Sequence, residues 1–285
     1  MHDSTGFYVL MCDVLAEDEN GRKYSGGNYV YFKNPDDVDV DDIIKKAVDE
    51  AILTMGAKKV KTNSYPIVLS QEVARTFLGV FNSVFSSDMV QKGLSLLKDK
   101  EGEIIASDKI TLIEDPTSEL AVVKYLFDDE GFKTYKKDII SNGKLQTLIY
   151  SLETAAKAKT SSTGNGMKGG YASPVGVGFT NLYLKPGDVS FDELLEKAEN
   201  GIYITEMKGM HASADPVTGD FSLESKGFMI ENGKLSYPVE QFTVAGNFYD
   251  VLKNVVSVAD NLEFKGTIGS PSFLIKELSV SGEDD

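Results

Sequence analysis

Apolar side chains recur every three or four positions in residues 41–55, which is the spacing of one face of a helix. These positions are Ile43, Ile44, Ala47, Val48, Ala51 and Ile52. Gly56 follows the stretch and supplies a stop signal. The pattern predicts an amphipathic helix over this stretch.

Serine residues mark the start of two further helical segments, because their hydroxyl oxygens cap free backbone N–H groups. Ser70 precedes a segment whose apolar stripe consists of Val73, Phe77, Val80, Phe81 and Val84. Ser86 or Ser87 restarts the helical pattern, which continues to Leu97. We expect a helix after each of these serines.

Two more helices are expected in the carboxy-terminal third. Ser190 and Glu193 have the spacing of a capping box, and Gly201 ends that helix. Asn247 is expected to cap the last helix. Its apolar stripe consists of Phe248, Val251, Leu252, Val255 and Val256.

Three Asn-Gly pairs predict tight turns of antiparallel hairpins, since both residues readily take positive φ. The pairs are Asn20-Gly21, Asn142-Gly143 and Asn232-Gly233. Further strands are expected over residues 202–207, 226–231, 235–244 and 272–280. Strands and helices without strict alternation indicate an α+β fold, mostly antiparallel sheet with hairpins and several packed helices.

Charge and composition narrow the classes of function. The 285 residues include 29 basic and 44 acidic side chains, a net charge of −15 that disfavours direct binding to nucleic acid. No apolar run approaches the roughly 20 residues that span a bilayer, so no membrane partner is expected. The single Cys12 cannot form an internal disulfide, which fits a cytoplasmic location. Its thiol is expected to be buried and inert.

The chain is poor in metal ligands. Hydrolytic zinc sites use about three protein ligands, most often histidines, and only His2 and His211 are present. His211 is either an ordinary loop histidine or a peptide-binding or proton-transferring group. A catalytic triad of Ser213, His211 and Asp215 is not expected, because residues this close in one loop seldom adopt triad geometry.

The segment from Lys159 to Gly170, "KTSSTGNGMKGG", is rich in glycine and hydroxyl side chains. It lacks the spacing of a phosphate-binding P-loop and is expected to be a mobile loop. Thr163, Gly164 and Asn165 within it are candidate residues for binding a peptide or partner.

Several segments in order resemble the PmbA/TldD family, whose members are also known as modulators of DNA gyrase. They include "PIVLSQEVA", "STGNG", "NLYLKPGDVSFDELL", "GIYITEMKGMH" and "TGDFSLESKGFMIENGKLSYPVEQFTVAGNFYDVLKNVV". The resemblance assigns residues 63–285 to the family's carboxy-terminal domain and residues 1–62 to strands and a helix of its middle region. The family's amino-terminal domain is not represented, so we expect a shortened member or a truncated piece.

The resemblance also implies where metal chemistry resides. The TldD branch carries a metal-binding His-Glu-x-x-x-His helix and a later cysteine. A gapless placement puts Gly79 and Val84 at the positions of the two histidines, Val80 at that of the glutamate and Ile268 at that of the cysteine. No cofactor is therefore expected in this chain, and zinc or a similar metal is expected only in a TldD-like partner.

The function implied is a PmbA/TldE-like subunit of a cytosolic TldD/TldE-type metallopeptidase, contributing to assembly and to binding of unfolded peptides. Candidate binding residues are Gly219, Asp220 and Ser222 together with His211. The turn at Gly219 and Asp220 and the hairpin at Asn232-Gly233 are expected to fix a sheet edge for strand addition. A homodimer is possible.

Two other functions stay open from the sequence. One is a protein regulator of the gyrase-modulator type without proteolytic activity. The other is a peptidase with an atypical site built from Asp220, Glu206 or His211.

Overall fold

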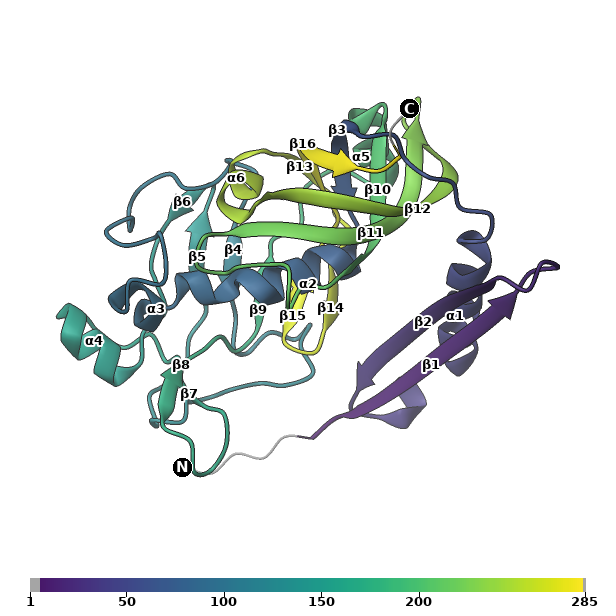
Figure 1. Ribbon diagram of the computed structural model, residues 1–285. Coiled ribbons are helices and arrows are strands. Elements are labelled where there is room, and N and C mark those ends of the chain that lie inside the picture. Colours follow the sequence, from purple (N-terminus) through teal and green to yellow (C-terminus); the bar gives the residue numbers. More distant parts are fainter. Residues whose placement is uncertain (1–5, 284–285) are drawn as a thin grey trace.

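A closed sheet of five strands forms the centre of the protein, whose computed structural model describes residues 6–283 (Figure 1). Strands β3 and β10 pair in parallel, and the other neighbouring pairs are antiparallel. The sheet closes because β12 pairs with both β11 and β16. The strands are β3 (Asn63–Leu69), β10 (Gly201–Lys208), β11 (Asp220–Glu231), β12 (Lys234–Asn247) and β16 (Phe273–Ser281). A further strand, β13 (Val255–Val258), pairs with residues 273–275 of β16.

A second sheet has six shorter strands. In spatial order they are β14 (Glu263–Lys265), β15 (Ile268–Ser270), β9 (Leu182–Leu184), β4 (Leu112–Glu114), β5 (Lys137–Ser141) and β6 (Lys144–Leu145). Helix α2 (Gln71–Phe81) lies between the two sheets, against β10 on one side and β15 on the other (Figure 1). The arrangement confirms the predicted α+β class.

Helix α2 carries the aromatic centre of the core. Ser70 caps it as predicted, its hydroxyl oxygen accepting from the Val73 N–H at 3.2 Å. Phe81 of α2 stacks on Phe248 with ring centroids 4.7 Å apart, and Phe77 meets Phe221 edge-on at 5.1 Å. These contacts hold α2 against the closed sheet.

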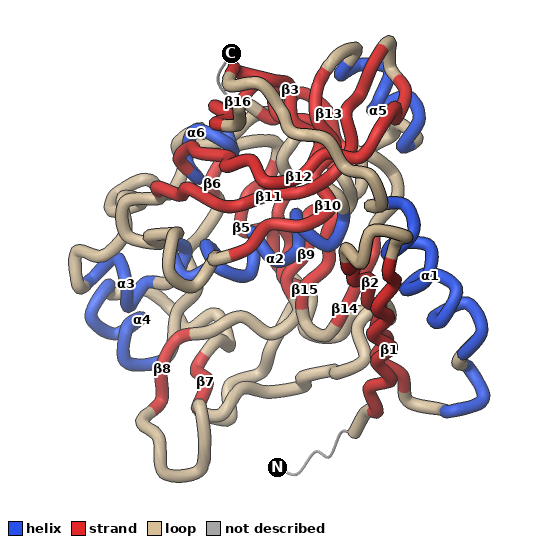
Figure 2. Tube along the Cα trace, turned by 45° about the vertical axis from the view of Figure 1, so that its right-hand side comes forward, coloured by secondary structure: helices blue, strands red, loops and turns tan. Residues whose placement is uncertain are grey.

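The amino-terminal part is a long hairpin covered by one helix (Figure 2). Strands β1 (Tyr8–Glu17) and β2 (Lys23–Phe32) pair along their full length, and α1 (Val40–Leu53) packs on one face. Gly26 permits this packing, since a Cβ there would lie 2.2 Å from the Ala47 carbonyl oxygen.

The remaining elements are short. They are α3 (Ser87–Gln91), α4 (Leu152–Ala158), α5 (Phe191–Ala198), α6 (Phe248–Lys253), the 3-10 turns η1 (Pro35–Asp37) and η2 (Asn82–Phe85), and the hairpin of β7 (Gly166–Lys168) and β8 (Val175–Val177). In the described part of the chain, no helix has the length and apolar character needed to cross a bilayer.

All three predicted Asn-Gly hairpins are present, as β1–β2, β5–β6 and β11–β12. At Asn142 and Asn232 the backbone takes positive φ, 46° and 51°, as the predicted turn type requires. The capping box of Ser190 and Glu193 and the Asn247 cap are also confirmed.

Two helix predictions were too long. The segment after Ser86 is helical only to Gln91, and the chain then continues in turns. Helix α6 ends at Lys253, and Val255 belongs to strand β13 rather than to the predicted helical stripe. The physical reason is pairing with β16, which suits β-branched valines and which no local pattern reveals.

Candidate functional site

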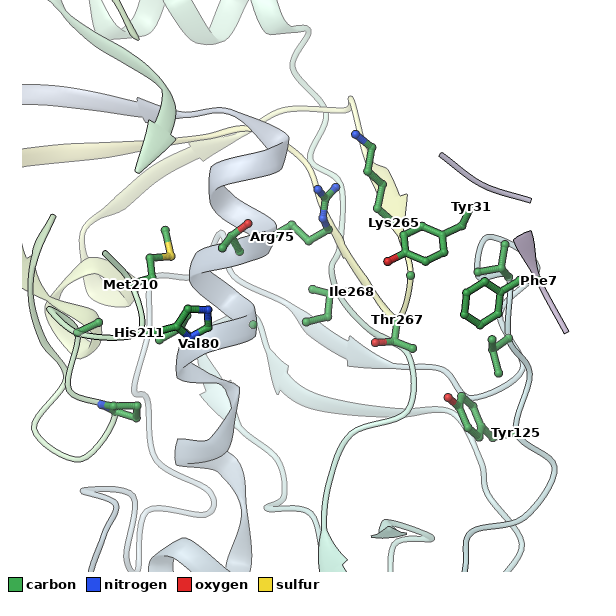
Figure 3. Close-up of a pocket in the computed structure, with 17 residues that line it drawn as sticks. Phe7, Tyr31, Arg75, Val80, Tyr125, Met210, His211, Lys265, Thr267 and Ile268 are labelled. Atoms are coloured by element: carbon green, nitrogen blue, oxygen red, sulfur yellow. The ribbon is translucent and has the colours of Figure 1, made fainter. Parts of the chain in front are cut away.

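A groove with a volume of about 790 Å³ crosses the outer face of helix α2 (Figure 3). Thr76, Gly79 and Val80 of α2 form its floor. Met210 and His211, which follow β10 after Gly209, form one wall beside this floor. We call this cavity the α2 groove.

The opposite wall of the α2 groove is the turn between β14 and β15 together with the strand ends that flank it. Lys265, Thr267 and Ile268 line it there, across the helix from His211 (Figure 3). Aromatic side chains from two distant parts of the chain close the far end, namely Phe7, Tyr31 and Tyr125. Most of the lining is therefore apolar or aromatic.

Positions that the family resemblance assigned to metal ligands meet at this groove. A Cβ placed on Gly79 would lie 3.2 Å from Cδ1 of Ile268, so these two positions are direct neighbours. Val80 also lines the groove. Val84 does not, because it lies beyond α2 in the turn η2 and is buried in the hydrophobic core.

A cluster of charged side chains joins α2 to the amino-terminal hairpin. Arg75 forms an ion pair with Glu72 and donates to Glu263 at 3.2 Å and to the Tyr29 hydroxyl oxygen at 3.0 Å. The Lys265 ammonium lies 4.4 Å from the centre of the Tyr29 ring and 3.5 Å from a Glu72 oxygen. The two cations are thus neutralised by two carboxylates.

Burial and pairing in this cluster shift the pKa of three groups. Burial alone would raise the pKa of Glu72, but Arg75 and Lys265 bring it below its usual value. Burial likewise opposes the charge of Arg75, yet Glu72 raises the pKa of the guanidinium. Burial raises the pKa of Tyr29. All three shifts favour a charged Arg75, a charged Glu72 and a neutral Tyr29.

A second cavity, of about 470 Å³, lies on the other side of this cluster. Thr205 and Glu206 of β10 line it, opposite Asp13 of β1. Strand β10 pairs with β3 only up to Ile204, because β3 ends at Leu69 and the chain turns into α2. Within the described residues, positions 206–208 pair with β11 alone and leave one strand edge open, and Thr205 lies at an irregularity of the β10–β11 pairing.

The candidates Thr163, Gly164 and Asn165 lie outside both cavities, in a buried network. Asn165 donates to Glu114 at 2.7 Å, and the Lys137 ammonium lies 2.6 Å from the same carboxylate. The prediction of a mobile loop is wrong for residues 162–166, because burial and these hydrogen bonds fix their side chains. Their part in binding stays a prediction.

The turn at Gly219 and Asp220 holds helix α6. Gly219 has φ +85° and a carbonyl oxygen that accepts from the Phe248 N–H at 2.7 Å. Asp220 accepts from the Asn247 side chain at 2.8 Å, and Asn247 also caps α6. The turn therefore fixes the start of the helix.

At Gly219 and Asp220, β11 has no free edge for the predicted strand addition, and binding at the Asn232-Gly233 hairpin stays a prediction. Ser222 is exposed, but β11 is already paired with β12 on one side and with β10 along part of the other. The loop that contains Ser213 occupies the remaining edge, because the Ser222 N–H donates to the Ser213 carbonyl oxygen at 2.9 Å. Both edges of β11 are used by the chain itself.

The other candidates for chemistry are dispersed. His211 is exposed in the α2 groove, and His2 lies outside the described residues. Glu206 pairs with Lys226, and no interaction within residues 6–283 joins Glu206 to Asp220 or His211. Cys12 is half-buried on β1, so full burial of the thiol was wrong.

Sequence analysis missed Arg75, Lys265 and Tyr29. The signal available for one pair was the spacing of Glu72 and Arg75, three residues apart on a predicted helix. Lys265 and Tyr29 carry no local signal, because they reach the site through tertiary packing of β14 and β2.

Within the part of the chain that the structure describes, no three His, Cys, Asp or Glu side chains gather in a way that could hold a metal ion. Of the positions that the resemblance assigned to metal chemistry, those in the α2 groove are Gly79, Val80 and Ile268, whose side chains carry no donor atom. These residues do not fit a hydrolytic metal centre.

The chain was compared with known families and sequences. The profile of the PmbA/TldA metallopeptidase C-terminal domain matches residues 62–282. A metalloprotease PmbA homolog of Buchnera aphidicola is 32% identical over 99% of this chain and 60% of its own length. Metalloprotease MJ0996 of Methanocaldococcus jannaschii is 34% identical over 90% of this chain and 56% of its own length. The chain thus spans less than two thirds of these relatives.

Solved structures give the same picture. A Thermotoga maritima protein described as a candidate modulator of a DNA gyrase has a TM-score of 0.89 and 36% identity, over 96% of this chain and 62% of that one. TldE from Thermococcus kodakarensis has a TM-score of 0.87 over 97% of this chain and 63% of its own. At 23% identity, the likeness to TldE concerns the fold alone.

Proposed function

Because the chain belongs to the PmbA/TldD metallopeptidase family, we propose that it acts as the PmbA/TldE-like subunit of a two-subunit cytosolic peptidase. In this proposal it binds unfolded peptide and helps to form the complex. A TldD-like homologue holds the metal and cleaves the peptide bond.

The observation that carries the proposal is the chemistry of the α2 groove. Gly79 and Ile268 are direct neighbours on its surface, and Val80 lies beside them. The TldD branch is expected to place metal ligands and a glutamate at these positions. Side chains without donor atoms there favour a subunit that has kept the groove and left hydrolysis to a homologue.

The open edge of β10 supports peptide binding. Its residues 205–208 present backbone groups without a strand partner on the side of β3. The edge runs from the second cavity, at Thr205, to the α2 groove, at Met210. An extended peptide can add to such an edge through main-chain hydrogen bonds and place alternate side chains in neighbouring pockets.

Co-expression with the TldD-like homologue of the same organism tests the proposal. We expect the two chains to purify together, and peptide hydrolysis to require the mixture or the homologue. Hydrolysis by this chain alone, abolished by His211→Ala, would instead favour an atypical site of its own.

A regulator without proteolytic activity is the second candidate, favoured by the description of the Thermotoga relative. The net charge of −15 disfavours contact with DNA but permits binding to a basic protein. Stable association with gyrase, together with failure to bind either peptide or a TldD-like chain, would support this function.

A further inference from the structure

We propose that the α2 groove selects a large uncharged apolar side chain, leucine-like or phenylalanine-like, from the bound peptide. This inference rests on the proposed function, because it assumes an extended peptide on the open edge of β10. It assigns the substrate class that the groove accepts.

The lining chemistry points to this class. Val80 forms part of the floor, Met210 one wall and Ile268 the other, while Tyr31 and Tyr125 close the far end. A side chain placed among them exchanges water for apolar contacts, which is the main source of affinity in such pockets.

The charges that line the α2 groove argue against binding of a charged peptide side chain. The chain has 44 acidic residues, yet among residues 6–283 no carboxylate lines the α2 groove. A basic side chain would therefore find no partner there. Two cations, Arg75 and Lys265, do line the groove, but both are paired with Glu72 and Glu263. An acidic side chain would compete with existing ion pairs, so the groove is complementary to an uncharged side chain.

The position of the strand edge supplies the geometry. The groove wall begins at Met210, two residues after β10 ends at Lys208. Because side chains of an added strand alternate between faces, one residue of the peptide can face the α2 groove while its neighbours point away. The groove therefore reads one residue of the peptide and the edge binds its backbone.

A peptide series tests the inference directly. Fluorescein-labelled Gly-Ser-Thr-X-Thr-Ser-Gly, with X as Leu, Phe, Ser, Asp or Lys, is titrated against the full chain by fluorescence anisotropy. We expect the Leu and Phe peptides to bind about 10-fold tighter or more than the other three, by analogy with apolar pocket discrimination.

Variants locate the preference. Val80→Asp and Thr267→Asp each add a carboxylate to the groove from opposite sides, and each is expected to abolish the preference for Leu and Phe. Val256→Asp is the matched control, since Val256 is 45% exposed on β13 and lies outside the groove lining. It should leave the preference unchanged.

The outcomes separate this inference from the proposed function. Equal binding of all five peptides, or tighter binding of the Asp or Lys peptide, overturns the inference and leaves peptide binding intact. Failure of every peptide to bind, with or without the TldD-like homologue, overturns both. If the variants do not fold, the titration of the five peptides against the unaltered chain still tests the inference.

Discussion

Among single residues, the binding candidates predicted from the sequence differ in whether they are exposed or buried. His211 lies in the α2 groove, where a ligand can reach it. Asn165 is fully buried, and Gly219 and Asp220 hold the cap of α6. A glycine or asparagine in a hydrophilic stretch has the same sequence signature whether it binds a ligand or supports the backbone. Only tertiary contacts separate the two.

The buried ion pair gives the first prediction. Glu114 has no exposed surface and accepts from Lys137, Asn165 and Thr180. Lys137→Met leaves its carboxylate buried without the cation, and we expect a loss of about 3 to 5 kcal/mol in the free energy of unfolding. Urea denaturation measures it.

The control for this prediction is Lys92→Met, which removes an exposed ion pair with Asp88. Its expected cost is about 0 to 1 kcal/mol. Equal costs at the two sites would show that the buried network contributes no special stability.

The second prediction concerns Gly219. A Cβ at this position would lie 2.8 Å from the Tyr249 ring, and φ is +85°. Gly219→Val should therefore destabilise the fold by about 2 kcal/mol or more, through backbone strain and steric clash. Asp220→Ala should cost only about 1 kcal/mol, the loss of one hydrogen bond.

Thermal unfolding compares the two variants, and peptide binding is measured on each at a temperature where it is folded. We expect unchanged affinity, because the turn supports α6 and lies outside both cavities. If a stable Asp220→Ala protein lost peptide affinity, the turn at Gly219 and Asp220 would be part of the binding site.

At the scale of elements, local signals predicted what local contacts build. Ser70, Ser190 and Asn247 cap the helices expected of them, and the Asn-Gly turns lie between paired strands. The closure of the central sheet depends on pairing of β12 with β16, about 35 residues later in the chain. Because no local pattern encodes such a partner, neither the closed sheet nor the strand at Val255 was predicted.

Helix α2 gives the third prediction. Gly79 lies in its last turns, and alanine there favours a helix by about 1 kcal/mol. The new methyl group would meet only Cδ1 of Ile268, the end of a side chain that borders the groove. We expect Gly79→Ala to raise the melting temperature.

The double variant Gly79→Ala with Ile268→Val removes the contacting atom and isolates the helix effect. A Gly79→Ala protein less stable than the original, restored by the second substitution, would show that Ile268 cannot move.

The docking of the hairpin on α2 gives the fourth prediction. The pKa of Glu72 is lowered from 4.5 in the folded protein, so its pairing contributes stability above that pH and loses it as the pH falls through the folded value. Glu72→Gln should therefore be less stable than the original protein at neutral pH, and the difference should shrink in acid.

Urea denaturation from pH 7 to pH 3 measures this difference. Glu277→Gln serves as the control, since Glu277 is exposed and belongs to no ion pair within the described residues. A difference for Glu72→Gln that stays constant with pH would mean that its charge does not hold the hairpin.

At the scale of the whole molecule, two units meet at the cavities. The unit of the hairpin and α1 contributes Tyr31 to the α2 groove and Asp13 to the second cavity. The closed sheet and α2 contribute Val80 to the groove and Glu206 to the second cavity. The family resemblance indicated the domain type and the absence of ligand side chains on α2. It did not reveal the groove, because the groove is formed by segments far apart in the sequence.

In the proposed function, hydrolysis by the complex depends on a metal held by the TldD-like homologue. Zinc content after dialysis, measured by mass spectrometry on this chain alone and on the purified pair, tests it most directly. We predict stoichiometric metal in the pair and none retained by this chain. A stoichiometric transition metal bound tightly by this chain alone would contradict the account.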